Sequence, residues 1–221
     1  MFSFSNREKK MYFCVMEVTK TPRRLFVSNA QDSSRMFKAK WLELLSKVHF
    51  TIPLIIYVPV IIWCLYQTGF NTTILLRFLL GLFIWSFSEY VLHRFVFHWT
   101  PPGKLGARIH FIFHGVHHDY PNDRLRLVMP PGVSIPLAFL FFFAFKITLG
   151  ASFVYSFFAG FIFGYLIYDM MHYSIHHLNW RHPIWEKIKQ QHMRHHFMEP
   201  DKGYGVSNPF WDYVFRTTFK K

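Results

Sequence analysis

The sequence predicts an all-α integral membrane protein, in which four transmembrane helices form two hairpins and carry a helical cap on the cytosolic side. Three observations support this fold class. Hydrophobic residues make up 52% of the 221 residues and aromatic residues 21%, which is unusual for a soluble domain. Four apolar segments each approach the roughly 20 residues that a helix needs to cross a bilayer. Basic residues are concentrated in the polar stretches around these segments.

The predicted transmembrane segments are residues 50–67, 73–92, 132–149 and 151–171. The first segment has no charged residue, and the others have few: Arg77, Glu89, Lys146 and Asp169. Buried helices of a soluble bundle are the alternative interpretation, but four such segments in so short a chain favour a membrane bundle. The length suits one domain.

The distribution of basic residues predicts the orientation in the membrane. The links at residues 68–72 and around Gly150 are short and have no Lys or Arg. The N-terminal region, residues 93–131 and residues 172–221 hold nearly all the basic residues, so the positive-inside rule places them in the cytosol. The cytosolic cap therefore consists of residues 93–131 and 172–221.

The N-terminal region is expected to precede the membrane domain of residues 35–221. Residues 1–34 predict a polar, basic tail with at most short local structure. Residues 35–49 predict a helix at the membrane surface, because apolar residues recur at helical spacing between basic ones. The net charge of +13 suits an anionic membrane surface, and no motif of nucleic-acid binding appears. Cys14 and Cys64 predict neither a disulfide framework nor a Cys-based zinc site.

Ten of the 14 histidines fall into four groups, in which spacings of three and four put side chains on one face of a helix. Histidine is the commonest metal ligand, so these groups predict metal binding. The other four, His49, His110, His177 and His182, fit the pattern less well and are not predicted as ligands. The predicted ligands are His93 and His98, then His114, His117 and His118, then His172 and His176, and finally His192, His195 and His196.

The predicted topology brings the four groups together. The second and fourth segments both run toward the cytosol and end in a histidine pair, and each is followed by a cap segment with an H-x-x-H-H group. Ten imidazoles exceed what one ion needs, since most sites take about four to six ligands. The sequence therefore predicts a dinuclear histidine site at the cytosolic ends of the helices.

The ligand type leaves two chemistries open. Two zinc ions could activate water for hydrolysis, whereas two irons could activate O₂ and attack an unactivated C–H bond. The location of the site at the membrane face favours a lipid substrate whose acyl chain enters between the helices.

Five segments resemble the fatty acid 2-hydroxylases of the fatty acid hydroxylase and sterol desaturase superfamily. The histidine pattern by itself resembles only the superfamily, and PNDRLRLVMPP narrows the resemblance to the 2-hydroxylases. The resemblance covers roughly residues 40–219. The segments are LHRFVFH (92–98), HGVHHDYPNDRLRLVMPP (114–131), YDMMHYSIHH (168–177), HMRHHF (192–197) and GYGVSNPFWDYVFRT (203–217).

This resemblance implies an O₂-dependent di-metal monooxygenase that hydroxylates carbon 2 of a long-chain fatty acyl group, as free acid, thioester or ceramide-type lipid. Iron is expected in the active enzyme and zinc is possible in purified protein, with the ten grouped histidines as ligands. A sterol or carotenoid hydroxylase or a lipid desaturase is the alternative within the superfamily. A non-catalytic membrane metal-binding or transport protein is the alternative of another class, but a transporter places its ligands near the bilayer midplane.

Many members of the family that the chain resembles carry an N-terminal cytochrome b5 domain with an HPGG haem motif. This sequence has no such motif, and residues 1–47 are too few for that domain. A separate electron donor, cytochrome b5-like or ferredoxin-like, is therefore expected. A basic cytosolic face could bind an acidic donor or anionic lipid headgroups. The expected membrane is the endoplasmic reticulum or a bacterial inner membrane. The residues proposed for this face are Arg124, Arg126, Lys187 and Lys189.

Several residues near the histidines are expected to support the site. Glu89 and Asp169 precede His93 and His172 by about one helical turn, so their carboxylates are predicted to accept the second N–H of a ligating histidine. An ion pair of such a carboxylate, for example with Arg94, is the alternative. Tyr168 and Tyr173 are expected to bound a substrate channel or to anchor at the membrane interface. Asp123 is expected to hold its loop by salt bridges with Arg124 and Arg126. Trp211 and Asp212 are expected to lock the C-terminal segment under the site.

Overall fold

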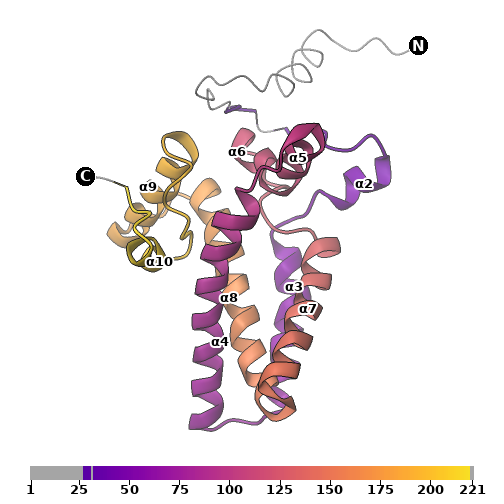
Figure 1. The fold of residues 1–221 in the computed structure, drawn as a ribbon, viewed down its shortest axis with the longest axis vertical. Coiled ribbons are helices and arrows are strands. Elements are labelled where there is room, and N and C mark those ends of the chain that lie inside the picture. The colour runs from indigo at the N-terminus through magenta and orange to yellow at the C-terminus, as the bar shows by residue number, and fades with distance from the viewer. Residues whose placement is uncertain (1–26, 31, 220–221) are drawn as a thin grey trace.

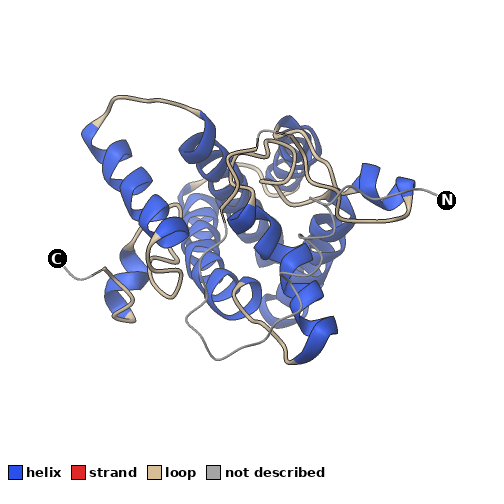
Figure 2. Cartoon of the chain, turned by 90° about the horizontal axis from the view of Figure 1, so that it is seen from above, coloured by secondary structure: helices blue, strands red, loops and turns tan. Residues whose placement is uncertain are grey.

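The computed structural model describes residues 27–30 and 32–219, and every regular element in these residues is a helix (Figure 1). Figure 2 shows the same residues from above, without a strand. Four long helices lie side by side, and the shorter helices gather at one end of them. This confirms the predicted all-helical class. The long helices are α3 (Thr51–Tyr66), α4 (Thr72–Val91), α7 (Pro131–Leu149) and α8 (Ala151–His177).

The short elements after α4 and after α8 form the cap at one end of the bundle, and α2 lies beside them. Two of them, η1 and η2, are π-helices, in which the backbone winds more widely than in an α-helix. Of the tail predicted for residues 1–34, residues 1–26 and 31 lie outside the described residues. The short elements are α2 (Lys40–Leu45), η1 (Leu92–Phe97), α5 (Gly103–His110), η2 (Phe111–Gly115), α6 (Val116–Asp119), α9 (Pro183–Phe197) and α10 (Phe210–Val214).

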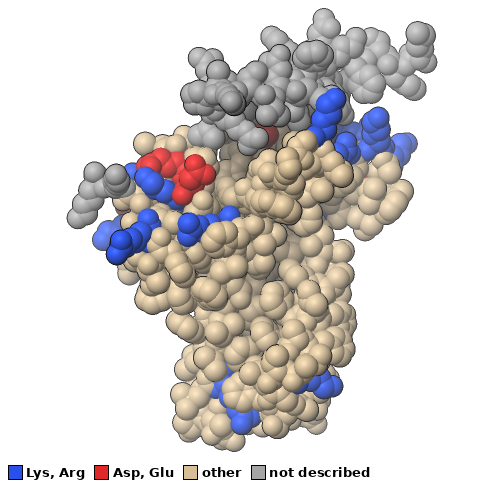
Figure 3. Space-filling view, viewed as in Figure 1, with Lys and Arg blue, Asp and Glu red and all other residues tan. Residues whose placement is uncertain are grey.

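Three helical stretches are long and apolar enough to cross a membrane, namely Thr72–Phe97, Pro131–Leu149 and Ala151–His177. The fourth apolar helix, α3, has 16 residues and is shorter than a typical span. Lys and Arg lie near both ends of the bundle on the face shown in Figure 3, and the band between them has no charged side chain. Most of α7 is exposed to the surroundings, and only 6% of the residues in its most apolar stretch are buried within the protein.

Close packing of α4 against α8 fixes the two helices that lead into the histidines. A Cβ at Gly81 would lie 1.9 Å from the carbonyl oxygen of Phe157, and a Cβ at Gly160 would lie 1.9 Å from that of Phe78. Gly164 gives the same room to the side chain of Trp85. Small residues allow backbones of membrane helices to approach closely in this way. The relative position of the two helices therefore depends on glycine.

The segment before α3 differs from the helix predicted for residues 35–49. Only Lys40–Leu45 is helical, because the Glu43 carboxylate accepts hydrogen bonds from the N–H groups of Met36 and Phe37, at 2.9 and 3.0 Å, and holds them in a loop. Residues 27–30 and 32–37 also bind the cap, and we call these residues the N-terminal strap. Its Ser28 N–H donates to the Asp119 carbonyl at 2.8 Å, and its Ser33 hydroxyl donates to the Asp123 carboxylate at 2.7 Å.

Arg126 joins the strap to the cap from a buried position. Its guanidinium pairs with Asp123 at 3.3 Å and with Glu43 at 2.6 Å, and it donates to the Ser34 carbonyl at 2.6 Å. The expected salt bridge between Asp123 and Arg126 is thus confirmed. The expectation that Arg126 belongs to an exposed docking face is wrong, because only 2% of its side chain is exposed.

The C-terminal segment is locked against α4, as expected for Trp211 and Asp212. The buried Asp212 carboxylate accepts hydrogen bonds from the N–H groups of Tyr204 and Gly205 and from the Thr217 hydroxyl. The indole of Trp211 donates to the Ser86 hydroxyl at 3.0 Å. These contacts hold the loop of residues 203–208 under the histidines.

Candidate metal centre

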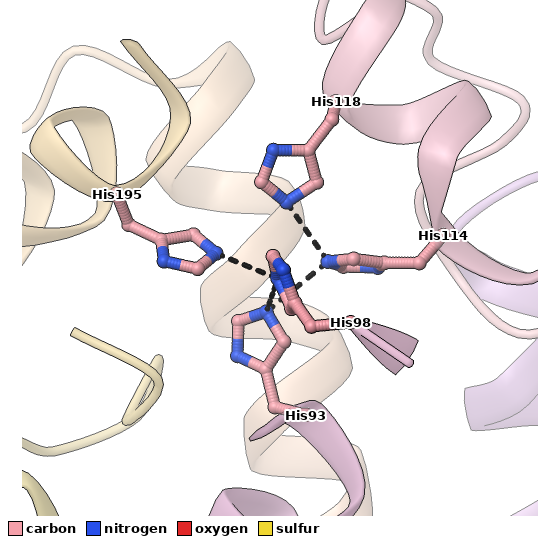
Figure 4. A group of neighbouring side chains, drawn as sticks. All are labelled: His93, His98, His114, His118 and His195. Atoms are coloured by element: carbon pink, nitrogen blue, oxygen red, sulfur yellow. Dashed lines mark hydrogen bonds between the residues drawn. The ribbon is translucent and has the colours of Figure 1, made fainter. Parts of the chain in front are cut away.

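The ten predicted histidines lie in two groups of five, and within each group one ring nitrogen per residue lies within 4.8 Å of all the others. Figure 4 shows the first group, with rings from different parts of the cap and α9 pointing toward one another. The structure thus brings all ten together, and none of His49, His110, His177 and His182 belongs to either group. Group one is His93, His98, His114, His118 and His195, and group two is His117, His172, His176, His192 and His196.

A π-helical turn brings the first pair together. His93 and His98 are five residues apart, which in an α-helix would separate them by about 140° around the axis. In η1 the N–H of His98 instead bonds to the carbonyl of His93, the i to i+5 pattern of a π-helix, at 3.2 Å. The Nε2 atoms of the two rings are then 3.3 Å apart. The π-helical backbone therefore brings the two rings together, although their spacing of five residues in an α-helix would not.

The two groups are interleaved along the chain and adjacent in space. His117 belongs to group two although its neighbours in the motif, His114 and His118, belong to group one. His195 likewise belongs to group one, between His192 and His196 of group two. The rings of His118 and His196 stack across the boundary with centroids 4.2 Å apart. Two ions bound in the two groups would therefore be neighbours.

The nitrogen positions fit a metal ion. In group one, Nε2 of His114 lies 3.1 Å from that of His93 and 3.0 Å from that of His118. In group two, Nε2 of His172 lies 2.8 Å from that of His117. Two ligands at about 2.1 Å from an ion and at right angles are about 3.0 Å apart, the observed spacing.

The tautomers support the same conclusion. Nδ1 of His93 donates to the carbonyl oxygen of Tyr204 at 2.6 Å, and Nδ1 of His195 donates to that of Lys202 at 2.6 Å. The Nε2 atoms of these rings therefore present lone pairs toward the other rings of group one. A metal ion between the rings would accept these lone pairs, the usual arrangement when a ligating histidine donates its other N–H to a carbonyl.

The histidines outside the long helices are held neutral, which is the form that binds metal. Burial, together with the nearby His195 and His110, lowers the pKa of His98 to about 2. Burial lowers the pKa of His195 to about 4. Burial and neighbouring imidazoles hold the other cap histidines well below the ordinary pKa: His114, His117, His118, His192 and His196.

Glu89 does not bind a histidine, contrary to the prediction. Its buried carboxylate accepts hydrogen bonds from the N–H groups of Val206 and Ser207, both at 2.8 Å, and from the Ser207 hydroxyl. The loop that it holds supplies the Tyr204 carbonyl for His93. Glu89 therefore acts on His93 through the backbone of this loop. Glu89 does not form the alternative ion pair with Arg94 either, because the Arg94 guanidinium donates to the Tyr90 hydroxyl.

Asp169 also departs from its predicted contact. Its buried carboxylate lies beside the Tyr165 hydroxyl and the backbone of Met129 rather than beside a histidine, and Nδ1 of His172 has no hydrogen-bond partner among the described residues. The same holds for Nδ1 of His192 and of His196. Three of the five rings of group two thus lack, among the described residues, a backbone anchor of the kind that His93 and His195 have in group one.

The two tyrosines predicted near the substrate occupy different positions. Tyr168 is buried beside His172, with ring centroids 5.6 Å apart, and beside Trp85. Tyr173 lies between Phe50 and His177, at 4.4 and 4.8 Å. Tyr168 therefore borders group two from the bundle interior, and Tyr173 packs against Phe50 at the start of α3.

A cavity lies beside group two, and no sequence pattern named above predicts it. It has a volume of about 590 Å³, and its wall includes His176 of group two, His177 and residues 122–125 of the turn after the first H-x-x-H-H group. The clustering of Asn, Asp and Arg next to the H-x-x-H-H group was a signal that could have indicated it. The sequence pattern of this turn predicts a salt-bridged loop and a docking face instead.

Comparison with known proteins agrees with this geometry. Residues 78–217 match the model of the fatty acid hydroxylase family. The chain is 37% identical to a dihydroceramide fatty acyl 2-hydroxylase of Arabidopsis thaliana, over 85% of this chain and 81% of the relative. It is 34% identical to the human fatty acid 2-hydroxylase, over 83% of this chain and 56% of the relative.

A solved structure has the same fold. The hydroxylase domain visible in full-length Scs7p superposes with a TM-score of 0.77 at 35% identity, over 82% of this chain and 70% of that chain. The ceramide very long chain fatty acid hydroxylase of Saccharomyces cerevisiae is 36% identical over 80% of this chain, which spans 47% of that relative. The chain thus spans about half the length of the yeast and human relatives.

An all-helical, apolar bundle that presents two five-histidine groups at one end defines a membrane hydroxylase-type fold with a candidate dinuclear centre. The chain belongs to the fatty acid hydroxylase family.

Proposed function

We propose that the chain hydroxylates carbon 2 of a long-chain fatty acyl lipid with O₂, with its ten grouped histidines as the ligands of two metal ions. The observation that carries the proposal is the convergence of these ten side chains into two groups of five, in a family member. The relatives named as fatty acyl or ceramide hydroxylases support the reaction and substrate class. The reaction consumes O₂, two electrons and two protons, and it yields one hydroxyl group on the substrate and one water.

Iron is the metal that we propose for the active enzyme. Bound iron supplies the O₂-activating redox chemistry that attack on an unactivated C–H bond requires, and zinc has no such chemistry. All-imidazole groups accept either metal, so zinc in purified protein is compatible with the site. The residues of the chain hold the ligands neutral, orient two rings of group one through backbone carbonyls, and bury the site from water.

The acyl chain is proposed to reach the site from the bundle side. Aromatic and aliphatic side chains of α3, α4, α7 and α8 form the interior beneath the histidines. A small cavity of about 20 Å³ there is lined by Tyr57, Trp85, Phe141 and Phe161 among others. Tyr168 lies between Trp85 and His172, so it borders the path from this interior to group two.

The membrane arrangement is proposed as four spans with a cytosolic cap. The apolar band of Figure 3 and the three long apolar helices support a membrane location. With 16 residues, α3 is about 24 Å long, so it would need flanking residues or a thinner bilayer to span. The short links before α4 and before α8 support two hairpins. The basic cap supports a cytosolic site, in the endoplasmic reticulum or a bacterial inner membrane.

A separate electron donor, cytochrome b5-like or ferredoxin-like, is proposed to bind the cap. Lys187 is exposed on α9, and Lys189 beside it donates to the Leu178 carbonyl and the Asn179 side chain. These two lysines and Arg124 form the proposed basic face, and Arg126 does not belong to it because its side chain is buried.

Lipid analysis tests the proposed function. Cells that express the chain with a compatible electron donor should accumulate 2-hydroxy acyl lipids, and His117→Ala should abolish the rise. Arg108→Ala, an exposed change on α5 outside both groups, should leave it intact. Equal lipid profiles in cells with the unchanged protein and in cells with His117→Ala would refute hydroxylation. Hydroxylated sterols, hydroxylated carotenoids or new double bonds would indicate another chemistry of the superfamily. Two tightly bound zinc ions with hydrolase activity would overturn it.

A further inference from the structure

The cavity beside group two has a polar wall. Asn122 and Arg124 come from the turn that follows the first H-x-x-H-H group, Asp32 comes from the N-terminal strap, and His176 and His177 come from the end of α8. Its volume of about 590 Å³ exceeds what a few water molecules need. No predicted ligand or apolar path accounts for a polar space of this size next to a metal site.

The position of the cavity matches a demand of the reaction. In a fatty acyl lipid, carbon 2 is bonded directly to the carbonyl carbon, about 1.5 Å away. When carbon 2 is placed at the metal centre, the carbonyl and the headgroup must lie immediately beside the histidines. The cavity meets this demand because His176 belongs both to group two and to the cavity wall.

The charges of the wall favour a neutral polar group. Asp32 and Asp123 contribute two carboxylates and Arg124 one guanidinium, while Arg126 neutralises Asp123 from behind at 3.3 Å. The Asp123 oxygens already accept hydrogen bonds from Ser33 and from the Leu125 N–H. The balanced charge disfavours a phosphate-rich or carboxylate headgroup, and the mixture of donors and acceptors suits amide and hydroxyl groups.

We propose that this cavity binds the polar end of the lipid substrate, with Arg124 and Asn122 as donors to its amide or hydroxyl oxygens and Asp32 as acceptor from its hydroxyls. The inference rests on the proposed function, since it takes carbon 2 as the reacting atom. The N-terminal strap is part of the subsite, because the bond from Ser33 to Asp123 places the neighbouring Asp32 in the wall. Residues before α2 thus contribute to substrate selection.

Binding and steady-state kinetics on the metal-loaded protein test the subsite. The probes are a fluorescent short-chain dihydroceramide and the free fatty acid with the same fluorescent acyl chain, both in detergent micelles. Arg124→Ala and Asp32→Asn should each weaken dihydroceramide binding and raise its KM roughly 10- to 100-fold for the loss of a charge-assisted hydrogen bond. The value of kcat, measured at a saturating concentration of the electron donor because Arg124 also belongs to the proposed donor face, should change less than about threefold, since the metal centre is intact. Arg124→Lys should restore part of the binding.

The matched control is Arg108→Ala, which removes the same side chain from the exposed face of α5 and should leave binding of both probes unchanged. Metal content and thermal unfolding show whether each variant is folded. Normal dihydroceramide binding and KM in both cavity variants would overturn the inference. An equal or larger loss of free-acid binding would also overturn it, because the cavity would then recognise a carboxylate.

The two proposals fail in different ways. If the protein binds dihydroceramide through Arg124 but forms no 2-hydroxy product, the proposed function fails and the binding assignment stands. If the protein forms the product while the cavity variants bind and turn over normally, the cavity assignment fails and the function stands.

Discussion

Nδ1 of His93 donates a 2.6 Å hydrogen bond to the carbonyl oxygen of Tyr204, a residue 111 positions further along the chain. This bond fixes the tautomer of His93, so that its Nε2 lone pair points into group one. The loop that carries Tyr204 is held by two buried carboxylates, Glu89 from α4 and Asp212 from α10. The orientation of one predicted ligand therefore depends on the C-terminal segment.

Glu89→Ala should weaken metal binding at group one although Glu89 contacts no ligand. Loss of the bonds to Val206 and Ser207 frees the loop and with it the Tyr204 carbonyl. Loss of such a supporting contact typically lowers metal affinity roughly 10- to 100-fold. Metal content after dialysis against graded chelator measures the effect. The exposed Glu186→Ala on α9 is the control, and an unchanged affinity in Glu89→Ala would contradict this account.

The two groups should release metal in sequence, with group two first. Two rings of group one are anchored to backbone carbonyls, whereas Nδ1 atoms of His172, His192 and His196 have no partner among the described residues. Anchoring raises ligand basicity and preserves ring orientation, so group one should hold its ion more tightly.

Metal content plotted against chelator concentration should pass through a plateau near one ion per chain. His172→Ala should remove the weaker phase and His114→Ala the stronger one. A single phase that releases both ions together would show that the anchors make no difference.

Gly81→Ala should destabilise the bundle. The added Cβ would lie 1.9 Å from the Phe157 carbonyl oxygen, which belongs to the backbone of α8 and cannot turn away. Overpacking of this kind costs about 1–3 kcal/mol. Gly132→Ala is the matched control, because nothing lies within 4 Å of its Cβ. Thermal unfolding in detergent measures both, and equal melting temperatures would argue against the close approach of α4 and α8.

Arg126→Ala should release the N-terminal strap. The change leaves Asp123 and Glu43 without their cationic partner, and breaking one side of a buried pair costs about 3–5 kcal/mol. Limited proteolysis should then cut within residues 27–37 faster than in the unchanged protein or in Arg108→Ala. Unaltered cleavage would mean that the strap is held by other contacts.

Local patterns in the sequence were sufficient for the helices and for the choice of ligands. Apolar length indicated the four long helices to within a few residues, except that α8 continues to His177 past the predicted end at residue 171. Histidine grouping along the chain selected the ten side chains that converge, and in three of the four groups spacings of three and four bring side chains to neighbouring positions on one helix. Both signals depend only on neighbours along the chain.

Tertiary structure decided how the ten histidines are divided. His117 and His118 are adjacent in sequence, about 100° apart on a helix, and face different groups. The π-turn that joins His93 to His98 also could not be predicted from the spacing. Likewise, Glu89 bonds to a loop that is 117 and 118 residues away in the chain. The sequence by itself determined which residues form the helices and which histidines gather, whereas the fold decided their partners, because contacts between distant segments follow from packing.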